Sequence, residues 1–281
     1  MTDQTHRTEG LDRIGEMFAR TRAEGRPAII PFVPGGWPER DATVEIVRAA
    51  VDAGADAFEI GLPFSDPLAD GVTNQRAYQQ ALENGFTLSD LLDVVRTLRA
   101  GGVRVPLLVM GYFNPLLAYG VSRFVRDAAD AGVDGLIIVD APPEEAGELE
   151  LSAREAGLHV VYLLAPTSTD ERIRLVAEHA SGFIYCVSVT GTTGARGELS
   201  KELPAFIARV RERTDLPLAV GFGVSERAHV EAIGEMADAA VVGSAFVTMV
   251  AEAEVSSRPE RVRAFVEGLT GRDSGRVPAA E

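Results

Sequence analysis

Two carboxylic acids close together in the sequence are candidates for acid–base chemistry. Glu59 lies inside the apolar run Ala57–Ile60, and Asp70 follows in a loop that also contains Asp66. A carboxyl group in apolar surroundings keeps its proton to higher pH and suits general acid–base catalysis. The alternative for Glu59 is a side chain that points outward and pairs with a cation on a helix. Loop aspartates usually hold turns or cap helices, which fits Asp66 before Pro67, whereas Asp70 can reach the same place as Glu59.

Two glycine-rich segments are candidates for binding phosphate. They are Val220–Ser225 and Val242–Phe246, and the second leads into a helix expected from Ala245 onward. Glycine lets a ligand approach the backbone closely, and the N–H groups at a helix start point toward an anion. Either segment alone is common in α/β folds. The two together are typical of (β/α)8 barrels, which often bind phosphate in the loops after the seventh and eighth strands.

A third glycine-rich segment, Ser188–Gly197, contains small and polar residues. Such a loop can act as a mobile lid that excludes water from a site. The alternative is an inert connection, and the two neighbouring phosphate-type loops favour the lid.

These segments follow short, nearly continuous apolar runs, the pattern of parallel strands buried on both faces. Longer amphipathic stretches between the runs predict helices. The expected strands are Ala28–Val33, Ala55–Ile60, Val105–Met110, Gly135–Val139, His159–Leu164, Gly182–Val187, Pro217–Val220 and Ala239–Val242. The expected helices are Ala42–Ala53, Leu88–Ala100, Val121–Ala131, Glu144–Ala156, Asp170–Glu178, Lys201–Arg213 and Arg227–Ile233.

Eight such strand–helix units predict an α/β fold, a single-domain (β/α)8 TIM barrel over residues 13–270. A doubly wound open sheet is the alternative, because strand count alone does not establish closure. Residues 1–12 and 271–281 are polar and are expected to be a flexible extension and a flexible tail. In a barrel the site lies at the carboxyl ends of the strands, where Glu59 and the glycine-rich loops are expected.

Composition excludes several functions. The net charge is −15, which disfavours binding to nucleic acid. The single cysteine, Cys186, lies in an expected strand, which favours a buried structural thiol. The four histidines do not have the spacing of metal ligands. No apolar run is long enough to span a membrane, and the polar N-terminus does not resemble a signal peptide, so we expect a cytoplasmic protein. Lys201 is not at a strand end, which disfavours a Schiff-base mechanism.

The segment Phe58–Gly71, FEIGLPFSDPLADG, closely resembles the signature of the tryptophan synthase α chain. The likeness extends from about Arg13 to Leu269. Further segments that resemble this family are Met110–Pro115, Leu163–Thr169, Tyr185–Arg196, Gly221–Ser225 and Val242–Ala245.

The resemblance implies a lyase that cleaves indole-3-glycerol phosphate to indole and glyceraldehyde 3-phosphate by a retro-aldol reaction. It implies that Glu59 protonates the indole carbon that bears the side chain and helps to deprotonate the glycerol hydroxyl. It implies that Asp70 binds the indole N–H and that Tyr185 lies beside Glu59. The other implied substrate contacts are the phosphate contacts Gly194, Gly223, Gly243 and Ser244, the indole pocket Phe32, Leu108, Tyr112 and Phe222, and the lid residue Thr193, which closes over Asp70.

The resemblance also implies a partner. Members of the family pair with a pyridoxal-phosphate β subunit in an αββα heterotetramer, and indole passes through a tunnel. The α chain itself uses no cofactor. Two loops depart from the family pattern, Val33–Pro38 and Val72–Gln75. The second faces the β subunit in the family, so these departures affect the expected partner affinity more than the chemistry.

Three alternatives remain at this point: a stand-alone indole-glycerol-phosphate lyase that releases free indole, a non-catalytic activator of a β subunit, and a different phosphate-binding barrel such as an isomerase. The intact Glu59 and Asp70 disfavour the activator, and the segment Phe58–Gly71 disfavours the isomerase.

Overall fold

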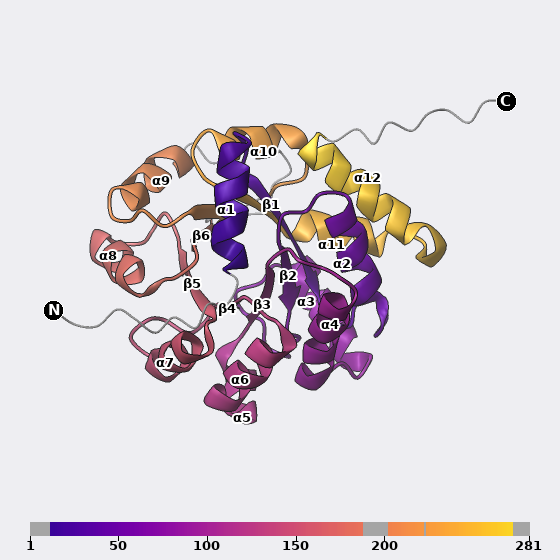
Figure 1. Cartoon of the computed structure of the whole chain (residues 1–281). Helices are drawn as coiled ribbons and strands as arrows, with labels where there is room; N and C mark the ends of the chain where they lie inside the picture. Colours follow the sequence, from indigo (N-terminus) through magenta and orange to yellow (C-terminus); the bar gives the residue numbers. More distant parts are fainter. Residues whose placement is uncertain (1–11, 188–201, 222, 272–281) are drawn as a thin grey trace.

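The structure is a computed structural model that describes residues 12–187, 202–221 and 223–271. Its eight parallel strands close into a barrel in sequence order, because β8 pairs with β1 (Figure 1). This confirms the (β/α)8 barrel over the open sheet. The strands are β1 (Ala28–Pro34), β2 (Phe58–Gly61), β3 (Leu107–Gly111), β4 (Gly135–Ile138), β5 (His159–Leu164), β6 (Ile184–Val187), β7 (Leu218–Gly221) and β8 (Ala239–Val242).

The strands are apolar on both faces because they separate two cores. Ala28 and Ile30 of β1 join a cluster inside the barrel, whereas Ile29 and Val33 join the larger cluster between the strands and the outer helices. Side chains of a strand alternate between these two faces. A polar side chain in a strand therefore faces one of two dry environments.

Helix α1 (Arg13–Ala23) closes the amino-terminal end of the barrel (Figure 1). Ile14, Met17 and Phe18 belong to the interior cluster, and the ring of Phe18 packs edge-on against Phe183 at 5.8 Å between centroids. The interior is thus sealed at this end, and access from solvent has to come from the carboxyl ends of the strands.

The helices predicted from the sequence are confirmed, with bounds that differ by a few residues. They are α2 (Ala42–Asp52), α4 (Leu88–Ala100), α6 (Val121–Ala131), α7 (Gly147–Ala156), α8 (Asp170–His179), α9 (Leu203–Arg211), α10 (Arg227–Gly234) and α11 (Ser244–Ala251). Helices α6 and α7 end at Gly132 and Gly157 in the left-handed conformation, with φ of 98° and 75°, which glycine adopts without strain.

Five further helical segments of the described residues were not predicted. They are α1, α3 (Val72–Glu83), α5 (Phe113–Tyr119), α12 (Arg258–Thr270) and a short 3-10 helix, Val255–Ser257. Helix α3 matters most for the site, because it follows directly on the loop that carries Asp70.

A side chain just before each even-numbered strand binds the backbone of the preceding strand. The Asp56 carboxylate accepts a hydrogen bond from the Ile29 amide at 3.0 Å, and the Asp134 carboxylate accepts one from the Leu107 amide at 2.8 Å. In the same way, the Ser181 hydroxyl accepts from the Val160 amide at 2.9 Å, and the Asp238 carboxylate from the Leu218 amide at 2.8 Å. We call these four the base staples. They join β1 to β2, β3 to β4, β5 to β6 and β7 to β8.

Arginines neutralise the buried aspartates among the base staples. Arg26 donates two hydrogen bonds to Asp56, at 2.6 and 2.9 Å, and Asp134 pairs with Arg99 and, at 2.8 Å, with Arg13. A buried carboxylate is tolerated when it is paired and hydrogen-bonded, as these are. Arginines therefore balance the charges of these two buried carboxylates at the amino-terminal end of the barrel.

The ends of the chain were expected to be flexible. Residues 1–11 and 272–281 lie outside the described residues, so the domain bounds stay a prediction. Asp12 caps α1 by accepting a hydrogen bond from the Gly15 amide, and Gly271 ends α12. None of the described helices is long and apolar enough to cross a membrane.

Candidate active site

Glu59 is a fully buried acid inside the barrel. Its neighbour two residues earlier, Ala57, belongs to the interior cluster, so alternation turns the Glu59 side chain to the interior as well. Neither carboxyl oxygen has a hydrogen-bond partner. Burial raises the pKa of Glu59 to about 8. The outward-facing alternative is thereby wrong, and the group is a proton donor at neutral pH.

Two pocket residues expected from the resemblance flank Glu59 in the sheet. Phe32 on β1 and Leu108 on β3 are its register partners, and both are buried. Apolar neighbours on both sides keep water away from the carboxyl group. Burial of this kind is the physical cause of its raised pKa.

Asp70 lies between β2 and α3 and is held by two donors. The Tyr112 hydroxyl donates to one carboxylate oxygen at 2.6 Å, and the Asn74 amide donates to the other at 3.1 Å. Burial raises the pKa of Asp70, while these two hydrogen bonds act in the opposite direction. The ring of Tyr112 packs against Phe64 at 5.3 Å between centroids. This arrangement fixes the direction in which the carboxylate faces.

Tyr185 on β6 completes a group of titratable side chains at this end of the barrel. Burial and, next, the charges of Glu59 and Asp70 raise its pKa well above its usual value. A Cβ atom placed on Gly221 would lie 2.3 Å from its hydroxyl oxygen, so only glycine fits at that point of β7. The structure therefore brings Tyr185 close to the two acids, as the resemblance implied.

The start of α11 offers an open set of backbone N–H groups. Gly243 precedes the helix, Ser244 begins it, and no side chain caps its first turn. A Cβ atom on Gly243 would meet no atom within 4 Å, and the same holds for Gly223 after β7, which has a φ of 48°. Free N–H groups beside open space are suited to a phosphate group.

Three expected site residues lie outside the described residues. They are Thr193, Gly194 and Phe222. The same is true of the expected lid, Ser188–Gly197, so these assignments stay predictions.

Two residues near the site were missed at the level of sequence. Asn74 holds Asp70, and its own side-chain oxygen is buried without a partner. Tyr78 is fully buried, and its hydroxyl also lacks a partner. Both belong to the unpredicted helix α3. The spacing of Asp70 and Asn74, four residues apart, is the one signal that was available, because residues at this spacing meet on a helical turn.

Of the two segments that depart from the family pattern, Val33–Pro38 contacts α3, and Val72–Gln75 is the first turn of that helix. The indole N–H of Trp37 donates to Gln80 at 2.8 Å, and the Asn84 amide donates to the carbonyl of Gly36 at 2.9 Å. The loop after β1 is thus tied to the helix that carries Asn74 and Tyr78. The first departure is therefore joined by hydrogen bonds to the helix whose first turn is the second departure.

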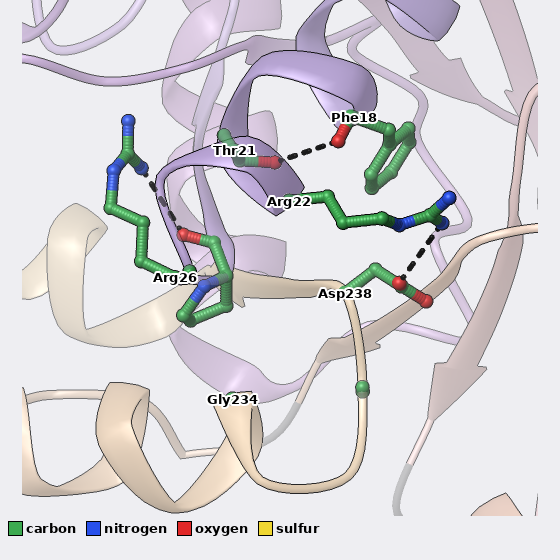
Figure 2. Close-up of a pocket in the computed structure, with 9 residues that line it drawn as sticks. Phe18, Thr21, Arg22, Arg26, Gly234 and Asp238 are labelled. Carbon is green, nitrogen blue, oxygen red and sulfur yellow. Dashed lines mark hydrogen bonds and ion pairs between the residues drawn. The ribbon is translucent and has the colours of Figure 1, made fainter.

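One hollow lies at the amino-terminal end of the barrel, away from the candidate site. It has a volume of about 280 Å³ and lies between the end of α1 and the loop before β8 (Figure 2). Its charges are mostly paired, because Arg22 lies 3.6 Å from Asp238 and Arg26 is bound to Asp56. No described residue of the candidate site lines it, and we do not assign it to the chemistry.

The class of protein follows from the fold and these side chains. The chain is a (β/α)8-barrel enzyme that carries a buried acid without a hydrogen-bond partner, Glu59, on its second strand. A family model described as "Tryptophan synthase alpha chain" matches residues 18–270. The chain belongs to the tryptophan synthase alpha chain family, which confirms the resemblance found in its motifs.

Similar proteins support this membership along the whole barrel. The tryptophan synthase alpha chain of Roseiflexus sp. (strain RS-1) is 52% identical over 93% of this chain and 100% of its own length. The one from Chloroflexus aggregans is 49% identical over 92% and 97%. The solved alpha subunit from Legionella pneumophila has a TM-score of 0.86 at 33% identity, over 93% and 98% of the two chains. A tryptophan synthase structure from M. tuberculosis has a TM-score of 0.83 at 37% identity, over 92% and 97%.

Proposed function

We propose that this lyase cleaves indole-3-glycerol phosphate to indole and glyceraldehyde 3-phosphate by a retro-aldol reaction, as the α subunit of tryptophan synthase. The observation that carries the proposal is Glu59, a protonated acid without a partner in the dry interior of the barrel. Such a group is unfavourable for folding and is retained where it serves chemistry.

Glu59 moves two protons, one in each of two steps. It first gives its proton to the indole carbon that bears the glycerol chain, which leaves a cationic ring and a carboxylate. The carboxylate then takes the proton of the hydroxyl on the adjacent chain carbon. The carbon–carbon bond breaks, its electrons return to the ring as indole, and the oxygen becomes the aldehyde of the second product. Glu59 ends protonated, as it began, because the proton taken from the hydroxyl replaces the one given to the ring.

Asp70 stabilises the cationic ring. Its carboxylate accepts hydrogen bonds from Tyr112 and Asn74, and each oxygen keeps a further lone pair for the indole N–H. A negative charge held in a fixed direction near a developing positive charge lowers the barrier without reorganisation. Tyr185, whose pKa responds to the charges of Glu59 and Asp70, is the third proposed catalytic side chain.

The phosphate binds at Gly243 and Ser244, with Gly223, Gly194 and the lid residue Thr193 as further contacts. The open space above Gly243 and the uncapped start of α11 support this assignment. Phosphate bound there holds the substrate with its ring toward Phe32, Leu108, Tyr112 and Phe222. The binding energy of this remote group is available to orient the reacting carbon.

A β subunit is the proposed partner, in an αββα heterotetramer of the cytoplasm, and it carries the pyridoxal phosphate while the α chain uses no cofactor. Two large apolar side chains flank Asp70 and are exposed, Leu68 at 89% and Val72 at 61%. Exposed apolar residues grouped in one loop are typical of an interaction surface. The relative from Saccharomyces cerevisiae, named "Tryptophan synthase", is matched over 37% of its own length, so this unit also occurs within a longer chain.

An indole-release assay tests the proposal. Purified chain with indole-3-glycerol phosphate should release indole and glyceraldehyde 3-phosphate in equal amounts, and Glu59→Gln should abolish this. The initial rate should rise when a β subunit is added. A rate that does not change with the β subunit identifies a stand-alone lyase, and indole formation by neither preparation refutes the proposed reaction.

A further inference from the structure

Two buried polar groups without partners lie at the end of β2. One is the carboxyl group of Glu59, and the other is the hydroxyl group of Tyr78 on α3. The Tyr78 ring packs edge-on against Phe32, with 6.3 Å between the centroids. A Cβ atom placed on Gly61 would lie 2.7 Å from the Tyr78 oxygen, so this hydroxyl lies directly over Gly61.

The hydroxyl and the acid are on the same face of the strand. Gly61 follows Glu59 by two residues, and side chains two residues apart share a face at a separation of about 6.6 Å. A glutamate side chain extended along the strand covers most of that distance and brings its carboxyl group to the hydroxyl. Tyr78 therefore offers an O–H donor within reach of Glu59.

The proposed reaction creates a need for such a donor. Glu59 is neutral before the reaction and becomes a carboxylate once it has given its proton to the indole ring. A carboxylate in a dry interior is costly unless it accepts a hydrogen bond. The Tyr112 hydroxyl is already bound to Asp70. The hydroxyl of Tyr78, by contrast, is fully buried and has no hydrogen-bond partner.

We infer that Tyr78 is a positioning residue, whose hydroxyl donates a hydrogen bond to the Glu59 carboxylate that forms during cleavage. This inference rests on the proposed function. Tyr78 keeps its own proton throughout, because burial and then the charge of Asp70 raise its pKa well above its usual value. Among the described titratable groups, Tyr78 and Tyr185 interact with the charge of Glu59, and Asp70 and Tyr112 interact in turn with Tyr78.

Tyr78→Phe in the full chain tests the inference, because it removes only the hydroxyl group. Loss of a hydrogen bond to a charged group should lower kcat by about 10- to 100-fold, with little change in KM. The same loss should raise the pKa of Glu59 further. The high-pH limb of the kcat/KM profile should therefore move up by about one pH unit.

The matched control is Tyr119→Phe. Its hydroxyl is bound to Asp127 on the outside of the barrel, at 2.6 Å, so the same atom is removed away from the site. The thermal midpoint of Tyr78→Phe should equal or exceed that of the parent, because the lost hydroxyl has no partner to leave behind.

Three outcomes contradict the inference. An unchanged kcat and pH profile in Tyr78→Phe, with Glu59→Gln inactive, overturns the role of Tyr78 and leaves the proposed function in place. A raised KM with unchanged kcat overturns it as well, because Tyr78 then acts in binding alone. Full activity in both Tyr78→Phe and Glu59→Gln overturns the inference together with the proposed function.

Discussion

Replacing Glu59 by glutamine should stabilise the protein while it removes activity, and the gain should depend on pH. The pKa of Glu59 rises from 4.5 to about 8 on folding because of burial. Below pH 4.5 the acid is protonated in both states and has no effect on the pH dependence. Between 4.5 and 8 the unfolded chain releases the proton and the folded chain retains it, so stability is lost as pH rises.

The magnitude follows from the size of the shift. One pKa unit corresponds to about 1.4 kcal/mol, so the loss is about 3 kcal/mol at pH 7 and about 5 kcal/mol above pH 8. Glutamine has nearly the same shape and does not titrate. The difference in free energy of unfolding between Glu59→Gln and the parent should therefore increase by about 1.4 kcal/mol for each pH unit from 5 to 8. Cleavage should fall by about 10²- to 10⁴-fold.

Urea unfolding of both proteins at pH 5, 6, 7 and 8 measures this difference. Glu178→Gln is the control, since Glu178 is exposed on α8 and the same exchange there takes place in solvent. A constant difference between parent and variant over this range would show that Glu59 is ionised in the folded protein. The acid–base assignment would then have lost its basis.

Three further predictions test other parts of the structure. Tyr112→Phe removes the 2.6 Å hydrogen bond to Asp70 and should lower kcat about tenfold. The low-pH limb of the kcat profile should move to higher pH, because the Asp70 carboxylate loses a donor. An unchanged limb would show that this hydrogen bond does not hold the carboxylate. Gly243→Val fills the open space before α11 and should raise KM for the phosphate substrate more than it lowers kcat. Steady-state kinetics measure both constants, and an unaltered KM would place the phosphate elsewhere. Asp134→Ala removes the ion-pair partner of the largely buried Arg99 and should lower the free energy of unfolding by about 3–5 kcal/mol. A loss below about 1 kcal/mol in urea unfolding would contradict the base-staple description.

The strand pattern was predictable because both faces of every strand are dry. The runs are continuously apolar, and this signal needs no tertiary information. Strand β2 nevertheless begins at Phe58 and not at Ala55 as predicted. The reason is Asp56, whose carboxylate binds the Ile29 amide and two arginines instead of extending the ladder. A side-chain contact between distant residues is not visible in a local pattern.

Helix α3 could not be predicted from hydropathy because its buried face is short. Only Ala77, Tyr78 and Ala81 are buried in the helix, and its first turn is polar. The site was predictable in part for the same kind of reason. Glu59 stood out as an acid in an apolar run, whereas Asn74 and Tyr78 are ordinary residue types whose importance comes from what they face.

The base staples divide the barrel into four quarters of equal design. Each quarter is a strand, a helical connection and a second strand that a single side chain joins to the first. Neighbouring quarters meet through main-chain contacts, such as the amide of His159 bound to the carbonyl of Asp134. A cut between β4 and β5 therefore separates the chain into two fragments, each of which keeps two base staples. The barrel thus consists of two halves with the same arrangement of strands and staples.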